Sequence, residues 1–363
     1  MTGRRTPTRR GFLRAAAGAA LGAAFGPAVR LRALAGPAQG DRRPVTIGGR
    51  RVKVIDVHAH CAIPEAASVL AGTPLASNGR AAANLVVGPE RLRAMDAQGI
   101  DVEVLSINPF WYGADRDLAA RLIDLQNEKL AEICRGNPDR FVALASVALQ
   151  HPDLAAAQLE AAVKTMGMHG AAIGGHVNAD ELSAARLDPF WAKAEALEAL
   201  VFIHPQGIPE VSPRLSGNGF LTNVIGNPLE TTIALSHLIF DGVLDRFPRL
   251  RVAAAHGGGY LPAYSARSDH GCAAFPANCR GTLAKRPTEY LKQMYFDSLV
   301  FTGEELRHLV AECGASQIVV GTDYPYPWTT TAVDHVLETP GLSDADRTAI
   351  LGGNAARLLG SPL

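Results

Sequence analysis

The sequence is poor in cysteine and has none in the spacing of a thiolate metal site. Its 363 residues include five cysteines, an odd number, and no two of them form a Cys-x-x-Cys pair. This argues against a disulfide scaffold and against a zinc site made of thiolates. Cys272 and Cys279 could pair if the protein reaches an oxidising compartment, and the sequence leaves that question open.

The chain also lacks long apolar runs and internal repeats. After the N-terminal segment, no stretch of about 18 uncharged apolar residues occurs, so we expect no membrane-spanning helix there. No repeat with a period of roughly 20–50 residues is visible, which disfavours solenoids and propellers. The composition, 47% apolar and 19% charged, is ordinary for a soluble globular protein, and the length suits one α/β barrel with additions.

The first 35 residues differ from the rest of the chain. Arginines come first, an Ala/Gly/Leu stretch follows, and Ala-Leu-Ala stands at positions 33–35, which is the order of an export signal. Arg9 and Arg10, followed by Gly-Phe-Leu, resemble the twin-arginine signal that exports folded proteins. We therefore predict a cleaved signal segment at 1–35, a catalytic domain at 36–363, and a periplasmic or extracellular location. A basic, disordered N-terminus with a chance arginine pair is the alternative.

Removing this segment changes the charge of the protein. Seven of the 35 lysines and arginines lie in it, all of them arginines, and it contains no acidic residue. The remaining chain holds 28 basic residues (35 less 7) against 35 acidic ones, a net charge of −7. An acidic domain without basic runs is a poor candidate for binding nucleic acid.

Beyond residue 45, apolar strand-like segments alternate with amphipathic helix-like segments. Most of the strand-like segments are continuous apolar runs, as expected for parallel strands covered on both faces. The eight predicted strands are 52–57, 100–107, 141–147, 169–175, 200–204, 250–256, 294–298 and 316–322. The predicted helices are 117–136, 153–167, 187–199, 228–246, 303–313 and 343–359.

This alternation is typical of an α/β fold, and the number of strands favours a (β/α)8 TIM barrel. A doubly wound open sheet is the rival, but no Gly-x-Gly-x-x-Gly follows the first strand. The segments 61–88 and 205–227, which follow strands one and five, are long and rich in Gly, Pro, Ser and Asn. We expect them to lie over the C-terminal mouth, where the active sites of such barrels are built.

Histidines gather at the C-terminal ends of the predicted strands. His58 and His60 end the first strand, and residues two apart in a strand point to the same face. Four later strands end in one polar residue each: His176, His204, His256 and Asp323. A lone histidine of this kind is more often a hydrogen-bonded core residue, and Asp323 could simply cap a turn. Six such residues on one rim nevertheless predict a shared site.

The residue types on this rim suit a metal ion. Three neutral imidazoles and a carboxylate fit a zinc-like divalent ion that keeps an open position for water. If the ligands are His58, His60, His204 and Asp323, His256 is free to handle the proton of the metal-bound water. The three glycines after His256 would let the backbone come close to a ligand. We predict one divalent metal ion, Zn2+, with His256 as the catalytic residue.

The same residues resemble a known family. Four stretches, His-Ala-His, Phe-Ile-His-Pro, Ala-His-Gly-Gly-Gly and Gly-Thr-Asp-Tyr-Pro, are similar in this order to the amidohydrolase-2 branch of the metal-dependent hydrolases. The similarity covers the chain from about residue 52 to residue 360. It implies a (β/α)8 barrel with one zinc ion and non-oxidative decarboxylation. The expected substrate is an aromatic or unsaturated carboxylic acid, of the aminocarboxymuconate-semialdehyde or hydroxybenzoate type.

The resemblance also implies roles for individual residues. It places the metal ligands and the proton-transferring histidine at the positions given above, and it implies a homodimer. In the family, an arginine eleven residues after that histidine holds the substrate carboxylate across the dimer interface. This position is Arg267 here, for which a surface ion pair is the alternative. His176, in the matching stretch 172–178, is the second predicted substrate-binding residue. The predicted fourth strand has no lysine to bridge two ions, which favours one metal.

Two positions depart from the family pattern, and two other functions stay open. The segment after His60 is short, so the family's second carboxylate-binding arginine has no clear counterpart, with Arg80 as a candidate. Gln206 stands where the family has an aromatic residue. The same mononuclear site could serve a hydrolase of an ester, lactone, amide or C–C bond, with His256 protonating the leaving group. A barrel that only binds a small carboxylate is the third possibility.

Overall fold

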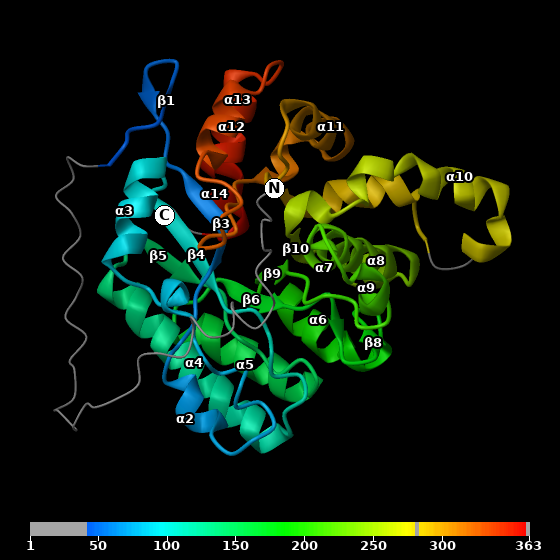
Figure 1. Ribbon diagram of the computed structural model, residues 1–363. Coiled ribbons are helices and arrows are strands. Elements are labelled where there is room, and N and C mark those ends of the chain that lie inside the picture. Colours follow the sequence, from blue (N-terminus) through cyan, green and yellow to red (C-terminus); the bar gives the residue numbers. More distant parts are fainter. Residues whose placement is uncertain (1–41, 280–282, 361–363) are drawn as a thin grey trace, which may run out of the picture. The chain divides into compact units, whose positions relative to one another are not determined.

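Eight parallel strands form the centre of the molecule (Figure 1). The computed structural model describes residues 42–279 and 283–360, so the predicted signal segment lies outside the described residues. The described residues all belong to one unit, Leu34–Leu363. The strands are β3 (Ile55–His60), β4 (Val102–Ser106), β5 (Phe141–Ala143), β6 (Gly170–Ile173), β9 (Leu200–Ile203), β10 (Arg251–Ala254), β11 (Met294–Asp297) and β12 (Ile318–Val319).

The strands follow one another around a closed ring. β3, β4 and β5 pair in parallel, and β6, β9, β10, β11 and β12 form a second parallel run. Single parallel bridges, from Ala145 to Ala171 and from Asp56 to Val320, join the two runs at both ends. The predicted (β/α)8 barrel is therefore confirmed, and all eight predicted strands are present.

Two layers of apolar side chains hold the barrel together. Alternate strand residues, such as Leu200 and Phe202, pack with those of the other strands and with α14 (Asn354–Leu358) in one buried cluster. The residues between them, such as Val201 and Ile203, pack with the helices in a second and larger cluster. Because successive side chains point to opposite faces of a strand, each strand is apolar on both faces. This explains the continuous apolar runs in the sequence.

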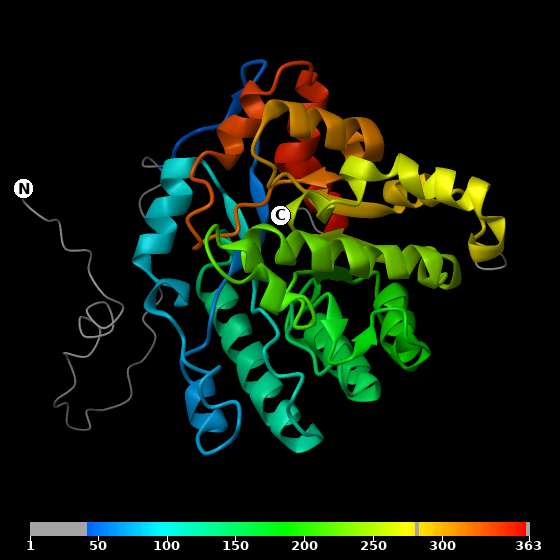
Figure 2. The ribbon, with the colours of Figure 1, turned by 45° about the vertical axis from the view of Figure 1, so that its right-hand side comes forward.

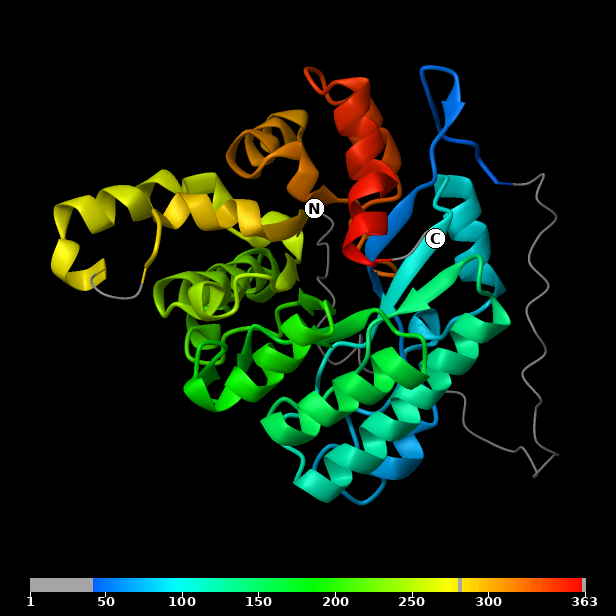
Figure 3. The ribbon, with the colours of Figure 1, turned by 180° about the vertical axis from the view of Figure 1, so that it is seen from behind.

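Helices surround the strands, as Figures 1 and 3 show. Those at predicted positions are α4 (Arg116–Gly136), α5 (Pro152–Thr165), α6 (Asp188–Ala196), α8 (Gly226–Phe240) with α9 (Val243–Arg246), α11 (Gly303–Cys313), and α13 (Asp344–Thr348) with α14. The longer helices that the sequence analysis did not predict are α3 (Pro89–Gln98), α10 (Ala266–Ala274) and α12 (Ala332–Glu338). Local signals agree with the main boundaries, since the Asp115 side chain caps α4 by accepting a hydrogen bond from the Leu118 N–H.

Two predicted helices are interrupted in the structure. The predicted helix 228–246 breaks at Gly242, whose φ of 72° lies in the left-handed region that glycine tolerates. The predicted helix 343–359 contains a π-helical turn, Ala349–Gly353. A Cβ atom at Gly352 would lie 2.0 Å from the carbonyl oxygen of Lys53, so this turn passes directly against the chain that leads into β3. Helical periodicity alone does not reveal either break.

The two long segments after β3 and β9 contain short helices. α2 (Ala66–Leu70) lies in the first segment and α7 (Leu221–Val224) in the second. Both segments contribute residues to the cavities at the C-terminal ends of the strands, as expected. α10 extends away from the barrel, as its yellow ribbon shows in Figure 2. None of the helices in the described part of the chain is both long and apolar enough to span a bilayer.

Candidate metal centre

β3 directs two imidazoles into the centre of the barrel mouth. His58 and His60 are two residues apart in this strand and so share a face, and the pairing with β4 is irregular between Asp56 and Ala59. Their Nε2 atoms lie 3.0 Å apart, and both side chains are buried. The Asp56 carboxylate stabilises the strand end, because it accepts hydrogen bonds from the His58 N–H at 3.0 Å and the Thr322 hydroxyl at 2.5 Å. The prediction that the two histidines point to one place is confirmed.

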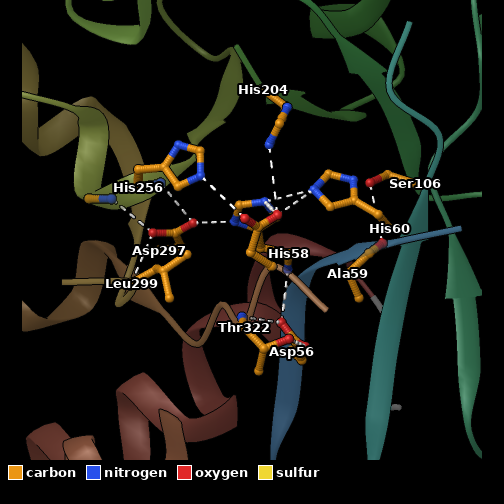
Figure 4. A network of polar contacts seen from close by, with 12 residues as sticks. Asp56, His58, Ala59, His60, Ser106, His204, His256, Asp297, Leu299 and Thr322 are labelled. Carbon is orange, nitrogen blue, oxygen red and sulfur yellow. Dashed lines mark hydrogen bonds and ion pairs between the residues drawn. The ribbon is translucent and has the colours of Figure 1, made fainter. Parts of the chain in front are cut away.

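His204 and Asp323 complete a group of four potential ligands. His204 follows β9 and Asp323 lies beyond β12, so the C-terminal ends of three strands supply the group. One donor atom from each of the four residues lies within 4.8 Å of the others. The Oδ1 atom of Asp323 is 2.8 Å from Nε2 of His60 and 3.9 Å from Nε2 of His204. Figure 4 shows the labelled histidines directed toward one another.

The four residues fit a divalent metal ion. Both ring nitrogens of His204 are buried and have no hydrogen-bond partner among the described residues, which is unusual for a buried polar group unless a ligand satisfies it. Three imidazoles and one carboxylate are the ligand types that zinc and similar transition metals prefer. Among the described residues, this is the one group with suitable geometry, and it has the composition that the sequence predicted.

The surroundings keep two of the imidazoles neutral and one protonated when no cation is bound. Burial lowers the pKa of His60 to about 4 and holds that of His204 well below its usual value. Burial also opposes protonation of His58, but the Asp323 and Asp297 carboxylates outweigh it and raise the His58 pKa to about 10. Metal ligands must be deprotonated, so metal binding would release the proton from His58.

Asp297, at the end of β11, is a functional residue that the sequence analysis missed. Its Oδ2 atom accepts a hydrogen bond from Nδ1 of His58 at 2.6 Å and from the backbone N–H of His256 at 3.0 Å. Its Oδ1 atom accepts from the N–H groups of Gly257 at 2.8 Å and Leu299 at 3.1 Å. The available signal was its position, since it is the charged residue next to the end of the predicted seventh strand, 294–298.

His256 lies beside the four ligands without belonging to their group. It follows β10, and its Nε2 atom is 3.7 Å from Oδ2 of Asp323. Its side chain is 16% exposed, and it is not among the residues that line the two cavities near the metal group. His256 and Asp323 have φ values of 55° and 59°, a conformation that is costly for residues other than glycine. The protein therefore holds both residues in strained positions at this site.

The glycines after His256 pack closely against neighbouring parts of the chain, while their approach to a ligand stays a prediction. A Cβ atom at Gly257 would lie 2.7 Å from the Val300 side chain, and one at Gly258 would lie 2.5 Å from the Phe296 ring. At Gly259 it would lie 2.1 Å from the backbone oxygen of Pro228. The glycines are thus required for close packing inside the protein, and this packing fixes the turn that carries His256.

A cavity of about 710 Å³ opens onto the metal group. His204 and Asp323 lie in its wall, together with four amide side chains and four aromatic ones: Asn108, Gln206, Asn223 and Asn227, and Phe110, Phe220, Tyr326 and Trp328. A smaller cavity of about 110 Å³ lies beside His60 and has Arg80 in its wall. The two cavities share Asn108, Phe110 and Tyr326. The arrangement can hold a ring-sized molecule against the metal group.

His176 lies apart from the ligand group and pairs with a buried glutamate. Its Nδ1 atom is 2.9 Å from Oε1 of Glu230, and this hydrogen bond raises the pKa of His176. Glu230, on α8, also accepts hydrogen bonds from the N–H groups of Gly175, Gln206 and Gly207. It therefore connects the loop after β6 to the loop after β9, which carries His204. The sequence analysis missed Glu230, since a lone acidic residue in a predicted helix gives no signal.

Arg267 is exposed on α10. Its guanidinium lies over the Tyr264 ring, with 5.9 Å between the guanidinium carbon and the ring centroid. It lines neither of the two cavities near the metal group of its own chain. Cys272 and Cys279 form a disulfide that joins α10 to the short helix after it, with 5.4 Å between their Cα atoms. This answers the question that the sequence left open.

The model of the amidohydrolase family matches residues 55–361 of this sequence. The chain belongs to the amidohydrolase family. Curated relatives support the same assignment. The chain is 34% identical over 273 residues to 2-amino-3-carboxymuconate-6-semialdehyde decarboxylase from Dictyostelium discoideum. The matched region covers 74% of this chain and 76% of the relative. It is 30% identical to a gamma-resorcylate decarboxylase from a Rhizobium species, and the match covers 74% of this chain and 85% of that relative.

Solved structures of this amidohydrolase's relatives share its fold. The 2,6-dihydroxybenzoate decarboxylase solved with 2,6-dihydroxybenzoate superposes with a TM-score of 0.75 at 29% identity, covering 85% of this chain and 99% of that one. A dihydroxybenzoic acid decarboxylase from Polaromonas, solved with manganese and 2-nitroresorcinol, superposes with a TM-score of 0.75 at 27% identity. The superposition covers 85% of this chain and 97% of that one. The chain is thus an amidohydrolase-superfamily enzyme whose relatives include carboxy-lyases, as the sequence analysis expected.

Proposed function

We propose that this amidohydrolase is a metal-dependent, non-oxidative decarboxylase of an aromatic or unsaturated carboxylic acid. The observation that supports this most directly is the position of His256, whose Nε2 atom lies 3.7 Å from Oδ2 of Asp323 although His256 is not one of the four potential ligands. Decarboxylation needs a proton for the carbon that loses its carboxyl group, and a positioned histidine beside a metal supplies one. The decarboxylases among the curated relatives support this choice of reaction.

One divalent ion would be held by His58, His60, His204 and Asp323. Zinc suits this ligand set, while a related structure contains manganese, so we propose zinc and name manganese as the competing ion. When bound, the ion would supply a positive charge that holds and polarises the oxygen atoms of the substrate. Metal analysis of protein purified without added metal distinguishes the two ions, since one of them should be present at one equivalent per chain.

The reaction then needs one proton transfer and one bond cleavage. His256 donates its proton to the ring or alkene carbon that bears the carboxylate. The bond from this carbon to the carboxyl group breaks, CO2 leaves, and the electron pair of that bond returns to the ring or the double bond. The imidazole, whose side chain is 16% exposed, regains a proton from solvent. Asp297 keeps His256 in position through its backbone N–H.

The large cavity supports a ring-shaped substrate with hydrogen-bonding substituents. Its aromatic side chains can stack on a planar ring, and its four amides can bind hydroxyl or carbonyl groups. Arg80, in the smaller cavity beside His60, is a candidate to bind a carboxylate. His176 is the other candidate within the chain, because Glu230 raises its pKa and so favours the cationic form.

We also propose a homodimer in which Arg267 binds the substrate carboxylate of the partner subunit. It is exposed on α10 and lines neither cavity near the metal group of its own chain, which supports this role. Arg267→Ala should then raise KM about tenfold while the metal content is unchanged. Arg286→Ala, which removes another exposed arginine near α10, is the control. Sedimentation that shows only monomers with full activity would contradict the shared site.

Export by the twin-arginine route, with a periplasmic or extracellular location, is our further proposal. The N-terminal order of arginine pair, apolar stretch and small-residue site supports it. The Cys272–Cys279 disulfide also supports it, because such bonds persist in oxidising compartments. Cell fractionation of a native producer would place the processed protein outside the cytoplasm. An intact N-terminus on a cytoplasmic protein would contradict export.

The test of function is a panel of acids and esters offered to the purified, metal-loaded protein. We expect CO2 from a hydroxybenzoate or a muconate-type acid. If the acids give no CO2 while esters, lactones or amides are cleaved, the enzyme is a hydrolase that uses the same mononuclear site. If neither group of compounds reacts, the barrel is a binding protein and the proposal is wrong.

A further inference from the structure

Gln206 lines the large cavity close to the proposed metal group. It lies two residues after His204, with Pro205 between them, and Cα atoms so spaced are at most about 7 Å apart. The ring of a proline fixes its φ angle, which limits the freedom of this short segment. Gln206 is an exposed residue of the cavity wall, so it can contact a molecule that enters the cavity. A ring held at the metal group is therefore within reach of its side chain.

The backbone of Gln206 is held from the buried side of its loop. Its N–H donates a hydrogen bond to Oε2 of Glu230 at 2.7 Å, and the N–H of Gly207 donates to the same oxygen. Glu230 is 3% exposed, and its Oε1 atom accepts a hydrogen bond from the Gly175 N–H at 3.2 Å. Hydrogen bonds to a charged carboxylate are stronger than those between neutral groups. The loop that carries Gln206 is therefore fixed against α8 and against the loop after β6.

The side chain of Gln206 lies directly on the backbone of Gly174. A Cβ atom at Gly174 would be 2.0 Å from Nε2 of Gln206 and 3.1 Å from its Cδ atom. Gly174 is buried, and its N–H donates a hydrogen bond to the Tyr112 hydroxyl at 3.1 Å. The surface beneath the carboxamide is thus itself fixed, and a larger residue at 174 would displace the carboxamide. Backbone and side-chain contacts together hold this amide at one place in the cavity wall.

The cavity around Gln206 suits an uncharged polar group. The described residues that line it include no Lys, Arg or Glu, and the one aspartate, Asp323, is a proposed metal ligand. A carboxamide offers an N–H donor and a carbonyl acceptor, and a hydroxyl group can pair with either. A second carboxylate on the substrate would find no cation in this cavity, and an unbalanced charge away from water is costly. A neutral hydroxyl group is therefore the suitable partner for Gln206.

We propose that Gln206 determines substrate specificity by binding a hydroxyl group on the substrate ring. The proposal deepens the function proposed above and rests on it. The carboxylate of the substrate lies at the metal group, and the carboxamide of Gln206 binds a hydroxyl elsewhere on the same ring. The preferred substrate is then an aromatic acid with one carboxylate and a hydroxylated ring, and an acid with a second carboxylate in place of that hydroxyl is rejected.

Binding of acids to the metal-loaded His256→Ala protein tests this role, because the variant should bind acids without consuming them. Calorimetry compares benzoate with 2-hydroxybenzoate, 2,3-dihydroxybenzoate, 2,4-dihydroxybenzoate and 2,6-dihydroxybenzoate. We expect one hydroxyl position to raise affinity about fivefold, the usual effect of one hydrogen bond between neutral groups. Adding Gln206→Leu should reduce this gain to less than twofold and leave the gains from the other hydroxyl positions unchanged.

Gly174→Ala tests the position of the carboxamide separately. Its methyl group should displace the carboxamide and so remove the same hydroxyl-dependent gain while Gln206 is still present. In the Gly174→Ala/Gln206→Leu protein the two losses should not add, because both act on one contact. Gly136→Ala is the matched control, since a Cβ atom there meets nothing within 4 Å. If Gly174→Ala does not fold, the Gln206→Leu series decides alone. Gln206 is exposed, so Gln206→Leu should keep the thermal midpoint and the metal content of its parent.

The charge of the accepted group is tested with the dicarboxylate in which a carboxylate replaces the identified hydroxyl. This compound should bind at least tenfold more weakly than the hydroxy acid when Gln206 is present. Gln206→Arg should narrow the difference, because a guanidinium pairs with a carboxylate.

Three results would overturn the proposal. The gain from every hydroxyl position could be the same with and without Gln206→Leu, the dicarboxylate could bind as tightly as the hydroxy acid, or none of the acids could bind. Failure of the proposed decarboxylation is a separate outcome: wild-type protein would then release no CO2, while the dependence of acid binding on Gln206 would still decide the specificity role.

Discussion

His58 donates a hydrogen bond from Nδ1 to Oδ2 of Asp297 across 2.6 Å, and both side chains are completely buried. The bond to Asp297 fixes the orientation of the ring. Nε2 therefore faces His60 and Asp323. The same carboxylate accepts a hydrogen bond from the backbone of His256. One buried aspartate therefore orients both a metal ligand and the residue proposed to transfer the proton.

Replacing this aspartate should weaken metal binding without removing a ligand. We expect Asp297→Asn to lower metal affinity roughly 10- to 100-fold, the usual effect of losing a carboxylate behind a histidine ligand. CO2 release should fall further than metal loss explains, because the His256 turn loses its anchor. Metal competition with a chelator measures the first effect, and turnover at saturating metal measures the second. Asp334→Asn, at a surface pair with Arg43, is the control. Unchanged affinity in Asp297→Asn would contradict the orienting role.

Glu230 should control substrate binding rather than metal binding. Its carboxylate accepts hydrogen bonds from the backbone N–H groups of Gln206 and Gly207, and Gln206 lines the cavity of about 710 Å³ that opens onto the metal group. A hydrogen bond to a charged group contributes about 1.5–3 kcal/mol, so Glu230→Gln should lower kcat/KM by tenfold or more. Steady-state kinetics with metal analysis measures this. Loss of metal with normal KM would instead show that Glu230 acts through His204.

The His176–Glu230 pair should make stability depend on pH. The hydrogen bond to Glu230 raises the pKa of His176 in the folded state above its unfolded value of about 6.5. Its contribution is therefore complete below about pH 6.5 and disappears as pH rises through the folded pKa. His176→Ala should lower the free energy of unfolding more at about pH 5.5 than at about pH 9. Denaturant titrations at both values test this, and an equal loss at both would contradict it.

The disulfide on the α10 side should stabilise that segment locally. Cys272 and Cys279 are seven residues apart, and closing so short a loop stabilises the folded segment by roughly 2 kcal/mol. In the Cys272→Ser/Cys279→Ser protein, proteolysis within 266–279 should become faster while the barrel stays intact. Mass spectrometry of the fragments measures both. Equal cleavage rates with and without the disulfide would contradict the prediction.

The sequence predicted the barrel and its metal ligands because both depend on repeated, regular features. Each strand is a continuous apolar run, and each ligand, such as His204, ends one of these runs. Parallel strands in a closed ring bring their C-terminal ends together, so position in the chain was sufficient to predict proximity. The ordered motifs then identified the family.

The residues that support these ligands gave no comparable signal. Asp297 and Glu230 are single carboxylates whose hydrogen bonds reach residues 24 to 239 positions away in the sequence, and only the folded ring places them there. The packing role of the glycines after His256 gave no signal either, because their neighbours, such as Phe296, come from another strand. α10 was missed because nine residues with few apolar positions resemble a loop.

The most direct test compares wild-type protein with His256→Ala, both loaded with metal, in an assay of CO2 release from 2,6-dihydroxybenzoate and related acids. The account predicts CO2 from the wild type with at least one of these acids. It predicts a loss of at least a hundredfold in His256→Ala, which should still bind one metal ion per chain, with His237→Ala as the surface control. Undiminished CO2 release by His256→Ala with its metal in place would contradict the central claim.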